Sequence, residues 1–222
     1  MTQSLQPEAR RKKCTVYVDG FNWYYGIFVH HPEWKWLNIQ GFFDNLRIDE
    51  DVSAVNFFTA TVDPNKTSSE RRDRLNRYLK AIKAFSKVRV ILGKYQMRNV
   101  QCGARCKMSY AVPEEKKTDV NIAVQILNDA VKGLADSMVL VSGDSDIEPA
   151  IQWVRENHPK IKITVYIPCI PEEESSRRND FYPRIGVTCR FLPLGDLGKY
   201  QLPDELRVGD TTVQRPTSWK KS

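Results

Sequence analysis

Short apolar runs and longer amphipathic stretches alternate along the chain. Six of the short runs are rich in β-branched and aromatic residues and have the length of strands. They lie at residues 14–20, 52–60, 87–97, 137–143, 160–169 and 187–194. Between them, apolar residues recur every three or four positions, as on one face of a helix. The pattern therefore predicts strands that alternate with helices.

Three stretches show the helical spacing clearly. Residues 68–85 have an apolar face made of Leu75, Tyr78, Leu79, Ile82 and Phe85, and their basic stripe from Arg74 to Lys87 is expected to be a solvated face. Residues 118–133 have an apolar face made of Val120, Val124, Leu127 and Val131, and Gly133 is placed to end that helix. The helix after residue 143 has an apolar side made of Ile147, Ala150, Ile151 and Val154. Shorter helices are expected at 21–28 and within 172–186.

This alternation indicates an α/β fold with a doubly wound, mainly parallel sheet. Residues 137–143 are almost entirely apolar, as expected for a strand covered by helices on both sides. Residues 99–115 have no periodicity and are expected to form an irregular loop or flap. We expect a disordered basic arm at 1–13, one domain at 14–197, and an extended tail at 198–222.

Composition narrows the class of protein. With 222 residues and 41% hydrophobic content, the chain can bury the core of one domain. Its 34 Lys and Arg outnumber its 27 Asp and Glu, and the net charge of +7 favours a polyanionic partner. No apolar leader and no apolar run of about 18 residues occurs, so a cytoplasmic protein without membrane insertion is predicted. The oligomeric state stays open, with a homo-oligomer among the alternatives.

The five cysteines are too few for a disulfide scaffold, and reduced thiols are expected. Cys102 and Cys106, in "CGARC", form the one close pair. Structural zinc needs four ligands and usually a tighter pair, so an ordinary loop is favoured over a zinc site there.

Acidic residues follow two of the predicted strands. Asp19 ends the first strand, and Asp144 and Asp146 follow the fourth. Asp119 lies in the first turn of the helix that precedes the fourth strand. Sites in parallel sheets form beyond the carboxyl ends of the strands, so these four acids can converge if the two strands are neighbours.

Four carboxylates in one place would repel one another unless a cation lies between them. Oxygen ligands of this kind favour Mg²⁺ or Mn²⁺. A cation held in this way suits phosphodiester hydrolysis, because it lowers the pKa of an attacking water and stabilises the leaving oxygen.

Each acid also has a structural interpretation. Asp146 could cap the following helix, although Ser145 and Glu148 already form an S-x-x-E capping box. Asp119 adds favourable charge at a helix N-terminus, with Thr118 as the expected N-cap. Neither a P-loop nor a G-x-G-x-x-G turn is present, so a dinucleotide cofactor is not expected.

Three segments, in this order and spacing, carry a family resemblance: "TVYVDGFNWYYG", "EEKKTDVNIAVQILNDA" and "MVLVSGDSDIEPAI". Over about residues 14 to 195 the chain resembles the NYN-domain family, in particular its LabA-like branch, which is related to PIN-domain nucleases. The closing "LPDELRVGDTTVQRPTSW" resembles the tail of many LabA-like members. The resemblance implies a PIN-like three-layer α/β/α sandwich and metal-dependent cleavage of RNA.

The resemblance also implies roles for individual residues. The acids Asp19, Asp119, Asp144 and Asp146 match the family's metal-holding and catalytic set, and Asn22 matches the polar residue beside the first acid. Ser142 and Ser145 lie in the same loop and are candidates for binding a phosphate or a metal-bound water.

Nearby basic and aromatic residues have two interpretations each. Lys116 and Lys117 flank the acids and are candidates for phosphate contacts, although charged pairs are often only solvated. Trp23, Tyr24 and Tyr25 could stack unpaired bases, but at least two of them are expected to be packing residues.

The leading hypothesis is an Mg²⁺- or Mn²⁺-dependent endoribonuclease that acts on single-stranded or loop RNA. The alternatives are a catalytically silent RNA-binding or regulatory module of the same fold, and a hydrolase of small phosphate esters. The preference for RNA over DNA comes from the resemblance alone.

Overall fold

A computed structural model describes residues 10–60, 68–101, 103 and 108–220, with the backbone alone at 95–99 and 110–116. Within this part of the chain, seven strands form one sheet in the order β4-β3-β2-β1-β5-β6-β7. All neighbouring pairs are parallel except β3 and β4. The strands are β1 Lys13–Asp19, β2 Asp51–Ala60, β3 Val88–Gln101, β4 Ser109–Lys116, β5 Ser137–Val141, β6 Lys162–Ile167 and β7 Thr188–Phe191.

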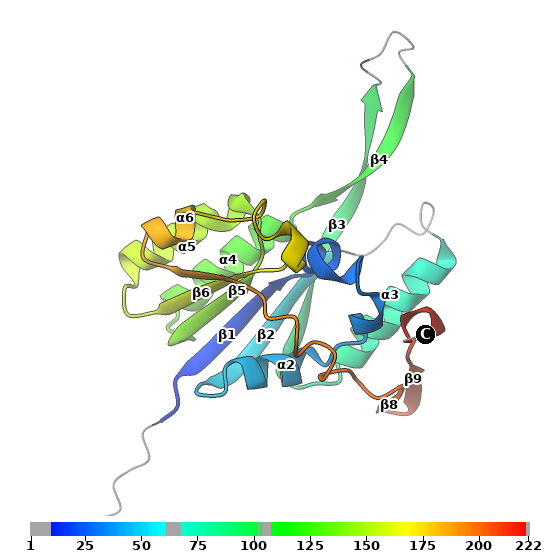
Figure 1. Ribbon diagram of the computed structural model, residues 1–222, viewed down its shortest axis with the longest axis horizontal. Helices are drawn as coiled ribbons and strands as arrows, with labels where there is room; N and C mark the ends of the chain where they lie inside the picture. The colour runs from blue at the N-terminus through cyan, green and yellow to red at the C-terminus, as the bar shows by residue number, and fades with distance from the viewer. Residues whose placement is uncertain (1–9, 61–67, 102, 104–107, 221–222) are drawn as a thin grey trace, which may run out of the picture.

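Helices cover both faces of this sheet (Figure 1). The α-helices are α1 Gly20–Trp23, α2 Ile39–Leu46, α3 Ser69–Ile82, α4 Thr118–Val131, α5 Glu148–Asn157 and α6 Phe181–Arg184. Shorter helical turns are η1 Tyr24–Phe28, η2 Pro32–Trp34, η3 Ser145–Ile147, η4 Pro171–Glu173 and η5 Thr217–Trp219. This arrangement confirms the predicted α/β fold and its three-layer sandwich.

The sheet separates two hydrophobic clusters because successive residues of a strand point to opposite faces. In β1, Val16 and Val18 join the cluster formed with α2 and α3, whereas Tyr17 joins the cluster formed with α4 and α5. Ile147 and Ile151 are buried in the second cluster, as the apolar spacing after residue 143 predicts.

The irregular loop predicted at 99–115 is wrong. β3 runs on to Gln101 and pairs in antiparallel fashion with β4, from Lys94 opposite Lys116 to Gln101 opposite Ser109. Figure 1 shows the two strands extending beyond the body of the sheet as a narrow arm. Hydrophobic alternation is the signal by which a strand is predicted from sequence, and residues 99–115 lack it, so this pairing was not predicted. Cys102 and Cys106 lie outside the described residues.

The extended tail predicted after residue 197 is also wrong. Strands β8 Glu205–Val208 and β9 Thr211–Gln214 form an antiparallel hairpin, with Gly209 in a left-handed conformation at its turn. The hairpin and the η5 turn pack on the layer of α3 through Val213 and Trp219. Pro203 and Pro216 flank the hairpin, where their lack of an N–H group does not interrupt strand pairing.

Backbone pairing with β2 begins at Lys12, one residue before the start of β1. The backbone oxygen of Lys12 accepts a hydrogen bond of 2.8 Å from the Asp51 amide, and Lys13 already belongs to β1. Residues 1–9 of the predicted basic arm lie outside the described residues.

Helix α4 turns a different face to the core from the one its valines suggest. Ile122, Ile126 and Ala130 are buried against the sheet. Val120, Val124 and Val131, predicted as the apolar face, have 64%, 58% and 65% of their surface exposed. Both sets have helical spacing, so periodicity alone does not decide which one is buried.

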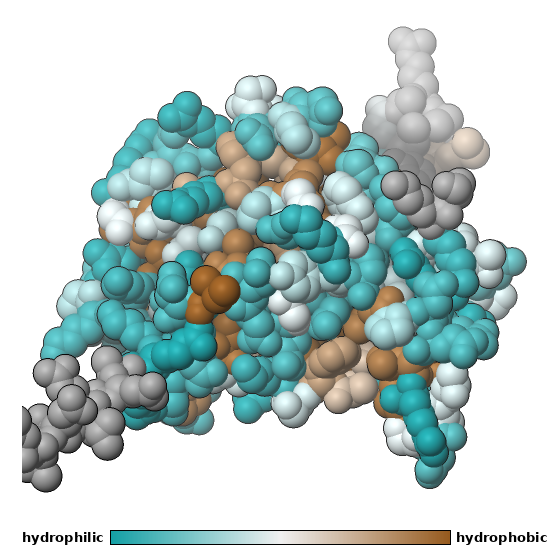
Figure 2. All heavy atoms as spheres, turned by 60° about the horizontal axis from the view of Figure 1, so that its bottom comes forward, coloured by the Kyte–Doolittle hydropathy of each residue, from teal (hydrophilic) through white to brown (hydrophobic). Residues whose placement is uncertain are grey.

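The surface is uneven in character. The face turned forward in Figure 2 is mainly hydrophilic, and its hydrophobic residues form small separate groups. No helix within the described ranges is both long enough and apolar enough to cross a lipid bilayer.

Candidate functional site at the carboxyl ends of β1 and β5

The strands that carry the acids are neighbours in the sheet. β1 and β5 are parallel, with Val18 in register with Val141. The loop that follows β5 therefore begins beside Asp19, the last residue of β1. This adjacency confirms the condition on which convergence of the acids depended.

Asp19 is buried, with 2% of its surface exposed, and both carboxylate oxygens accept hydrogen bonds. Oδ1 accepts from the Phe21 and Asn22 amides at 3.0 Å each, which caps α1. Oδ2 accepts from Asn22 Nδ2 at 2.6 Å and from Ser142 Oγ at 2.9 Å. Burial raises the pKa of Asp19, and these four hydrogen bonds oppose that rise.

Asn22 and Ser142 connect Asp19 to the loop after β5. The Asn22 side-chain oxygen accepts a hydrogen bond of 3.1 Å from the Gly143 amide. Ser142 Oγ accepts one of 3.0 Å from the Asp144 amide while it donates to Asp19. We call Asp19, Asn22, Ser142, Gly143 and Asp144 the strand-end ring. Its bonds fix the path of the acidic loop against the end of β1.

Asp144 holds the turn that follows. Its Oδ1 accepts a hydrogen bond of 2.9 Å from the Asp146 amide and caps η3. The predicted capping box of Ser145 and Glu148 is therefore wrong as an account of this turn. Glu148 instead accepts a hydrogen bond of 2.8 Å from Asn179 Nδ2. The turn leaves Ser145 and Asp146 exposed at the surface.

Asp119 approaches the other acids from α4. It lies in the first turn of that helix and is partly buried. Burial, followed by the negative charges of Asp144, Asp19 and Asp146, raises the pKa of Asp119 to about 6. A carboxyl group responds in this way only when the other carboxylates lie near it. The structure thus brings all four predicted acids into one electrostatic neighbourhood.

The start of α4 differs from the expectation in one detail. The N-cap is Lys117, in a left-handed conformation with φ of 80°, and Thr118 is the first helical residue. Lys117 is exposed beside the acids. Lys116 ends β4, and its side chain lies outside the described residues.

The four acids offer the oxygen ligands that divalent cations prefer, but they are not arranged around a preformed metal site. Among the described residues, no three acidic, histidine or cysteine side chains stand close enough to enclose a metal ion. Asp119 nevertheless bears the repulsion of three other carboxylates, which a cation would relieve. Asp144 and Asp146 are partly or fully exposed, so their side chains have room to turn toward an ion.

The aromatic residues after α1 divide differently from the prediction. Trp23 alone is buried, at 1%, whereas Tyr24 and Tyr25 are 39% and 59% exposed. The expectation that at least two of the three are packing residues is wrong. The rings of Tyr24 and Tyr25 meet edge to face, with centroids 5.2 Å apart.

Sequence reasoning missed a basic group beside these tyrosines. Lys35 Nζ lies 5.0 Å from the centre of the Tyr24 ring. Burial and the positive charges of Arg74 and Arg71 lower the pKa of Lys35. Lys35 is separated from α3 by more than thirty positions in the sequence, so no local spacing could have joined it to those arginines.

Two comparisons relate this chain to known proteins. A protein of Pseudomonas putida, 6-hydroxy-3-succinoylpyridine 3-monooxygenase HspA, is 25% identical over 250 aligned positions, which cover 99% of this chain and 78% of that protein. The profile of the NYN domain matches residues 13–182, a span that contains all four acids. The chain therefore belongs to the NYN domain family.

Proposed function

We propose that the protein is a metal-dependent endoribonuclease that hydrolyses phosphodiester bonds of single-stranded or loop RNA. The observation that carries the proposal is the adjacency of β1 and β5, which places the loop of Asp144 and Asp146 beside Asp19. Burial, followed by the charges of the other three acids, raises the pKa of Asp119 to about 6, in keeping with this arrangement. Such a concentration of negative charge destabilises an empty site and favours one that binds Mg²⁺ or Mn²⁺. Membership of the NYN family, whose fold is that of PIN-like nucleases, supports the same reaction class.

The acids divide into two roles in this proposal. Asp119, Asp144 and Asp146 would hold the cation, because they are partly or fully exposed. When bound, the cation supplies a water of lowered pKa and neutralises charge on the phosphate. Asp19 acts mainly as a positioning residue and adds negative charge, since its two oxygens already accept hydrogen bonds within the strand-end ring.

The neighbouring side chains suit a single-stranded substrate. Tyr25 and Tyr24 offer exposed rings on which unpaired bases could stack. Lys35, Lys117 and Ser145 supply cationic and hydroxyl groups for phosphate contacts. The exposed tyrosines follow within six residues of Asp19 in the sequence. A single-stranded RNA bound to their rings would therefore pass close to the acids.

The test is a cleavage assay on labelled single-stranded RNA, hairpin RNA and single-stranded DNA, with Mg²⁺, Mn²⁺ or EDTA. We expect wild type to cut RNA with either metal, and EDTA to abolish cutting. Asp144→Asn should reduce the rate about 100-fold or more, because it removes a charge that holds the cation. Asp210→Asn, at an exposed turn of the C-terminal hairpin, is the matched control and should cut like wild type. Equal rates for Asp144→Asn and wild type would refute the site.

A binding experiment tests the tyrosines separately from cleavage. In the Asp144→Asn background, Tyr25→Ala should weaken binding of single-stranded RNA by about 1–3 kcal/mol, the usual value of one stacked base. Val29→Ala, at an exposed position one turn further on, should leave binding unchanged. Unchanged affinity in Tyr25→Ala would remove the stacking role and leave the assignment of the acids intact.

The same assays separate the alternatives. Binding of RNA without cleavage under any metal would favour a catalytically silent module. Hydrolysis of small phosphate esters with intact RNA would favour the ester hydrolase. The closing segment after residue 197 is consistent with placement in the LabA-like branch, which we propose on the sequence pattern alone.

A second candidate function is oxygenation of a small aromatic compound. The observation that favours it is the extent of the similarity to the Pseudomonas putida monooxygenase, which covers 99% of this chain and so includes the hairpin beyond the matched domain. The test is oxygen consumption with 6-hydroxy-3-succinoylpyridine, with reduced nicotinamide and reduced flavin nucleotides tried in turn as the two-electron donor. Consumption that depends on the pyridine would support oxygenation, and its absence together with RNA cleavage would exclude it.

A further inference from the structure

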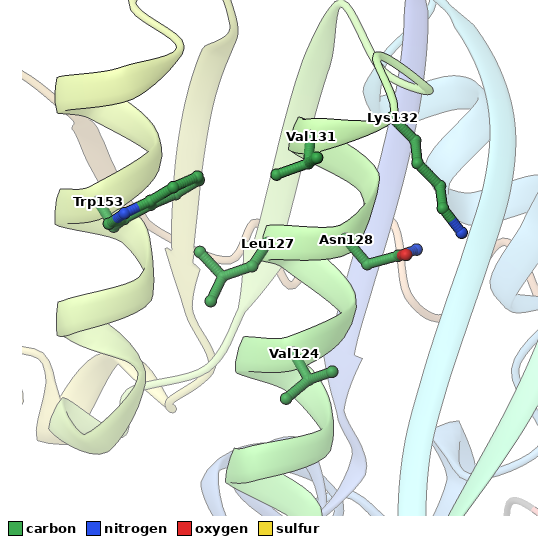
Figure 3. A pocket seen from close by; sticks show the side chains of 6 residues that line it. All are labelled: Val124, Leu127, Asn128, Val131, Lys132 and Trp153. Atoms are coloured by element: carbon green, nitrogen blue, oxygen red, sulfur yellow. The ribbon is translucent and has the colours of Figure 1, made fainter.

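The outer face of α4, with Trp153 of α5 beside it, is largely apolar, although no described segment covers it. A groove of about 400 Å³ is lined by Val124, Leu127, Asn128, Val131 and Lys132 of α4 and by Trp153 of α5. Figure 3 shows Trp153 lying toward Leu127 and Val131 across the space between the two helices. Val120, one turn earlier, extends the same stripe. We call Val120, Val124, Leu127, Val131 and Trp153 the valine face.

The valine face lacks the charges that a solvated helix carries. Between Asp119 and Lys132 the one charged residue of α4 is Asp129. Asp129 is buried, where it accepts hydrogen bonds from Tyr17 and Gln125 at 2.8 Å each. A helix on the surface of a monomer normally turns polar residues outward. Contiguous exposed apolar residues instead mark an interaction surface, whose centre is depleted of charge.

The spacing of the stripe fits a second copy of itself. Its α4 members are four, three and four positions apart, which is the spacing of a seam between two packed helices. An interface with twofold symmetry uses the same patch on both subunits, so the patch must be complementary to itself. An apolar stripe without charges meets that requirement along its centre.

Charged residues on the two sides of the valine face are also complementary between two copies. Lys132 lies on the side of α4 away from Trp153 (Figure 3). Glu156 is exposed on α5, one turn beyond Trp153, and accepts a hydrogen bond of 2.8 Å from Gln152. A twofold axis along α4 would turn the Lys132 side of one copy onto the α5 side of the other. The cation of each copy would then meet an acid of its partner.

We propose that two copies of this chain associate through the valine face, with α4 against α4 and the twofold axis along the helix. Lys132 then lies beside Glu156 of the partner subunit. Because α4 begins at Asp119 and α5 follows Asp146, both groups of acids open at the same end of the dimer. The inference rests on the exposed face and on the charges beside it, and it holds whichever reaction the acids perform.

The test is the molar mass of the full chain, measured by sedimentation equilibrium over a range of micromolar concentrations. We expect wild type to form a dimer and Val124→Glu to be monomeric, because the new charge enters the centre of the face. Ile48→Glu, at a comparably exposed apolar residue far from α4 in the sequence, is the matched control and should remain dimeric. A monomeric wild type, or a dimer that survives Val124→Glu, would overturn the proposal.

A charge exchange tests the orientation without entering the apolar centre. Lys132→Glu should weaken the dimer about tenfold through repulsion between acids, and adding Glu156→Lys should restore it. Both positions are exposed, so neither change threatens the fold. If the double variant is no tighter than Lys132→Glu, the axis does not run along α4. Circular dichroism of each variant confirms that the subunit is folded, and if Val124→Glu is not, Val131→Lys serves in its place.

Discussion

The outer faces of the two helical layers of this protein are covered to different extents. On one side of the sheet, the C-terminal hairpin covers α3, and Trp219 packs within 6.2 Å of Tyr78, measured between ring centres. On the other side, no described segment covers the outer face of α4, and its valines are exposed. The C-terminal hairpin thus covers the layer of α3, which we call the covered layer. The layer of α4 and α5, which we call the open layer, is left available for contact. The comparison predicts that equivalent substitutions in the two layers have very different effects.

The largest effect is expected in the covered layer. Trp36 is fully buried, lies 6.1 Å from Tyr78 between ring centres, and donates a hydrogen bond of 2.8 Å to the Pro203 carbonyl. Trp36→Ala should lower the free energy of unfolding by about 3–5 kcal/mol, since it opens a cavity and leaves that carbonyl without its donor. Trp153→Ala, in the open layer, is the matched control. Urea denaturation that gave equal losses for both would break the comparison.

A smaller loss is expected where the open layer meets the sheet. Tyr17 donates a hydrogen bond of 2.8 Å to the buried carboxylate of Asp129, and burial raises the pKa of Tyr17 far above its usual value. Tyr17→Phe should cost about 1–3 kcal/mol, because Asp129 loses a donor that water cannot replace. Urea denaturation measures the change. Tyr200→Phe, at a partly exposed tyrosine, should cost less, and a Tyr17→Phe protein as stable as wild type would show that the inner side of α4 does not depend on this bond.

Asp119, in the open layer, should make the stability of the protein depend on pH. Its pKa rises from 3.8 to about 6 on folding, so the protonated form favours the folded state. That stabilisation is fully present below the unfolded pKa and is lost as the pH rises through about 6. In metal-free protein, Asp119→Asn should therefore gain about 1 kcal/mol near pH 8, a value reduced for the exposure of the group, and almost nothing near pH 4.

Thermal melting in EDTA at the two pH values measures this difference, with Asp210→Asn as the control for loss of an exposed charge. Added Mg²⁺ should raise the melting temperature of wild type more than that of Asp119→Asn. A variant that is less stable than wild type at the higher pH would contradict the repulsion among the acids.

The smallest effect is expected on the valine face itself. Val131→Thr should change the free energy of unfolding by less than about 0.5 kcal/mol, measured at a concentration low enough to keep the chain monomeric. The same change at Val139, which is fully buried in β5, should cost about 1–3 kcal/mol because its hydroxyl is removed from water. A large loss at Val131 would mean that the open layer is covered after all.

Much of the fold follows from local pattern, and the errors have two causes. Strands such as 137–143 are readable because burial on both faces demands an unbroken apolar run. In α4, however, Val120, Val124 and Val131 are spaced as helically as Ile122 and Ile126. A helix with two apolar faces does not reveal which one meets the sheet. The β3–β4 arm and the C-terminal hairpin were missed because short strands outside the central core carry little periodicity.

The candidate site was readable for a different reason. Asp19, Asp144 and Asp146 were identified from their positions at strand ends, and that argument needed only the adjacency of β1 and β5. The ring of hydrogen bonds through Asn22 and Ser142 required atomic positions. Lys35 was missed because its neighbours on α3 are distant in sequence, and exposure of Tyr24 and Tyr25 depends on how η1 leaves the core.

The strand-end ring changes how the acids should be used as markers when other NYN chains are compared with this one. Asp19 caps α1 and anchors the loop after β5, so a chain that had lost its chemistry would still need that residue to keep its shape. Asp146 offers its amide to Asp144 and leaves its own carboxylate exposed. Ionised Asp119 lowers the stability of the fold, because burial and the other three acids disfavour its charge. Under the proposed function, loss of Asp119 or Asp146 would therefore be the informative sign of lost hydrolytic activity, and retention of Asp19 would say little about activity.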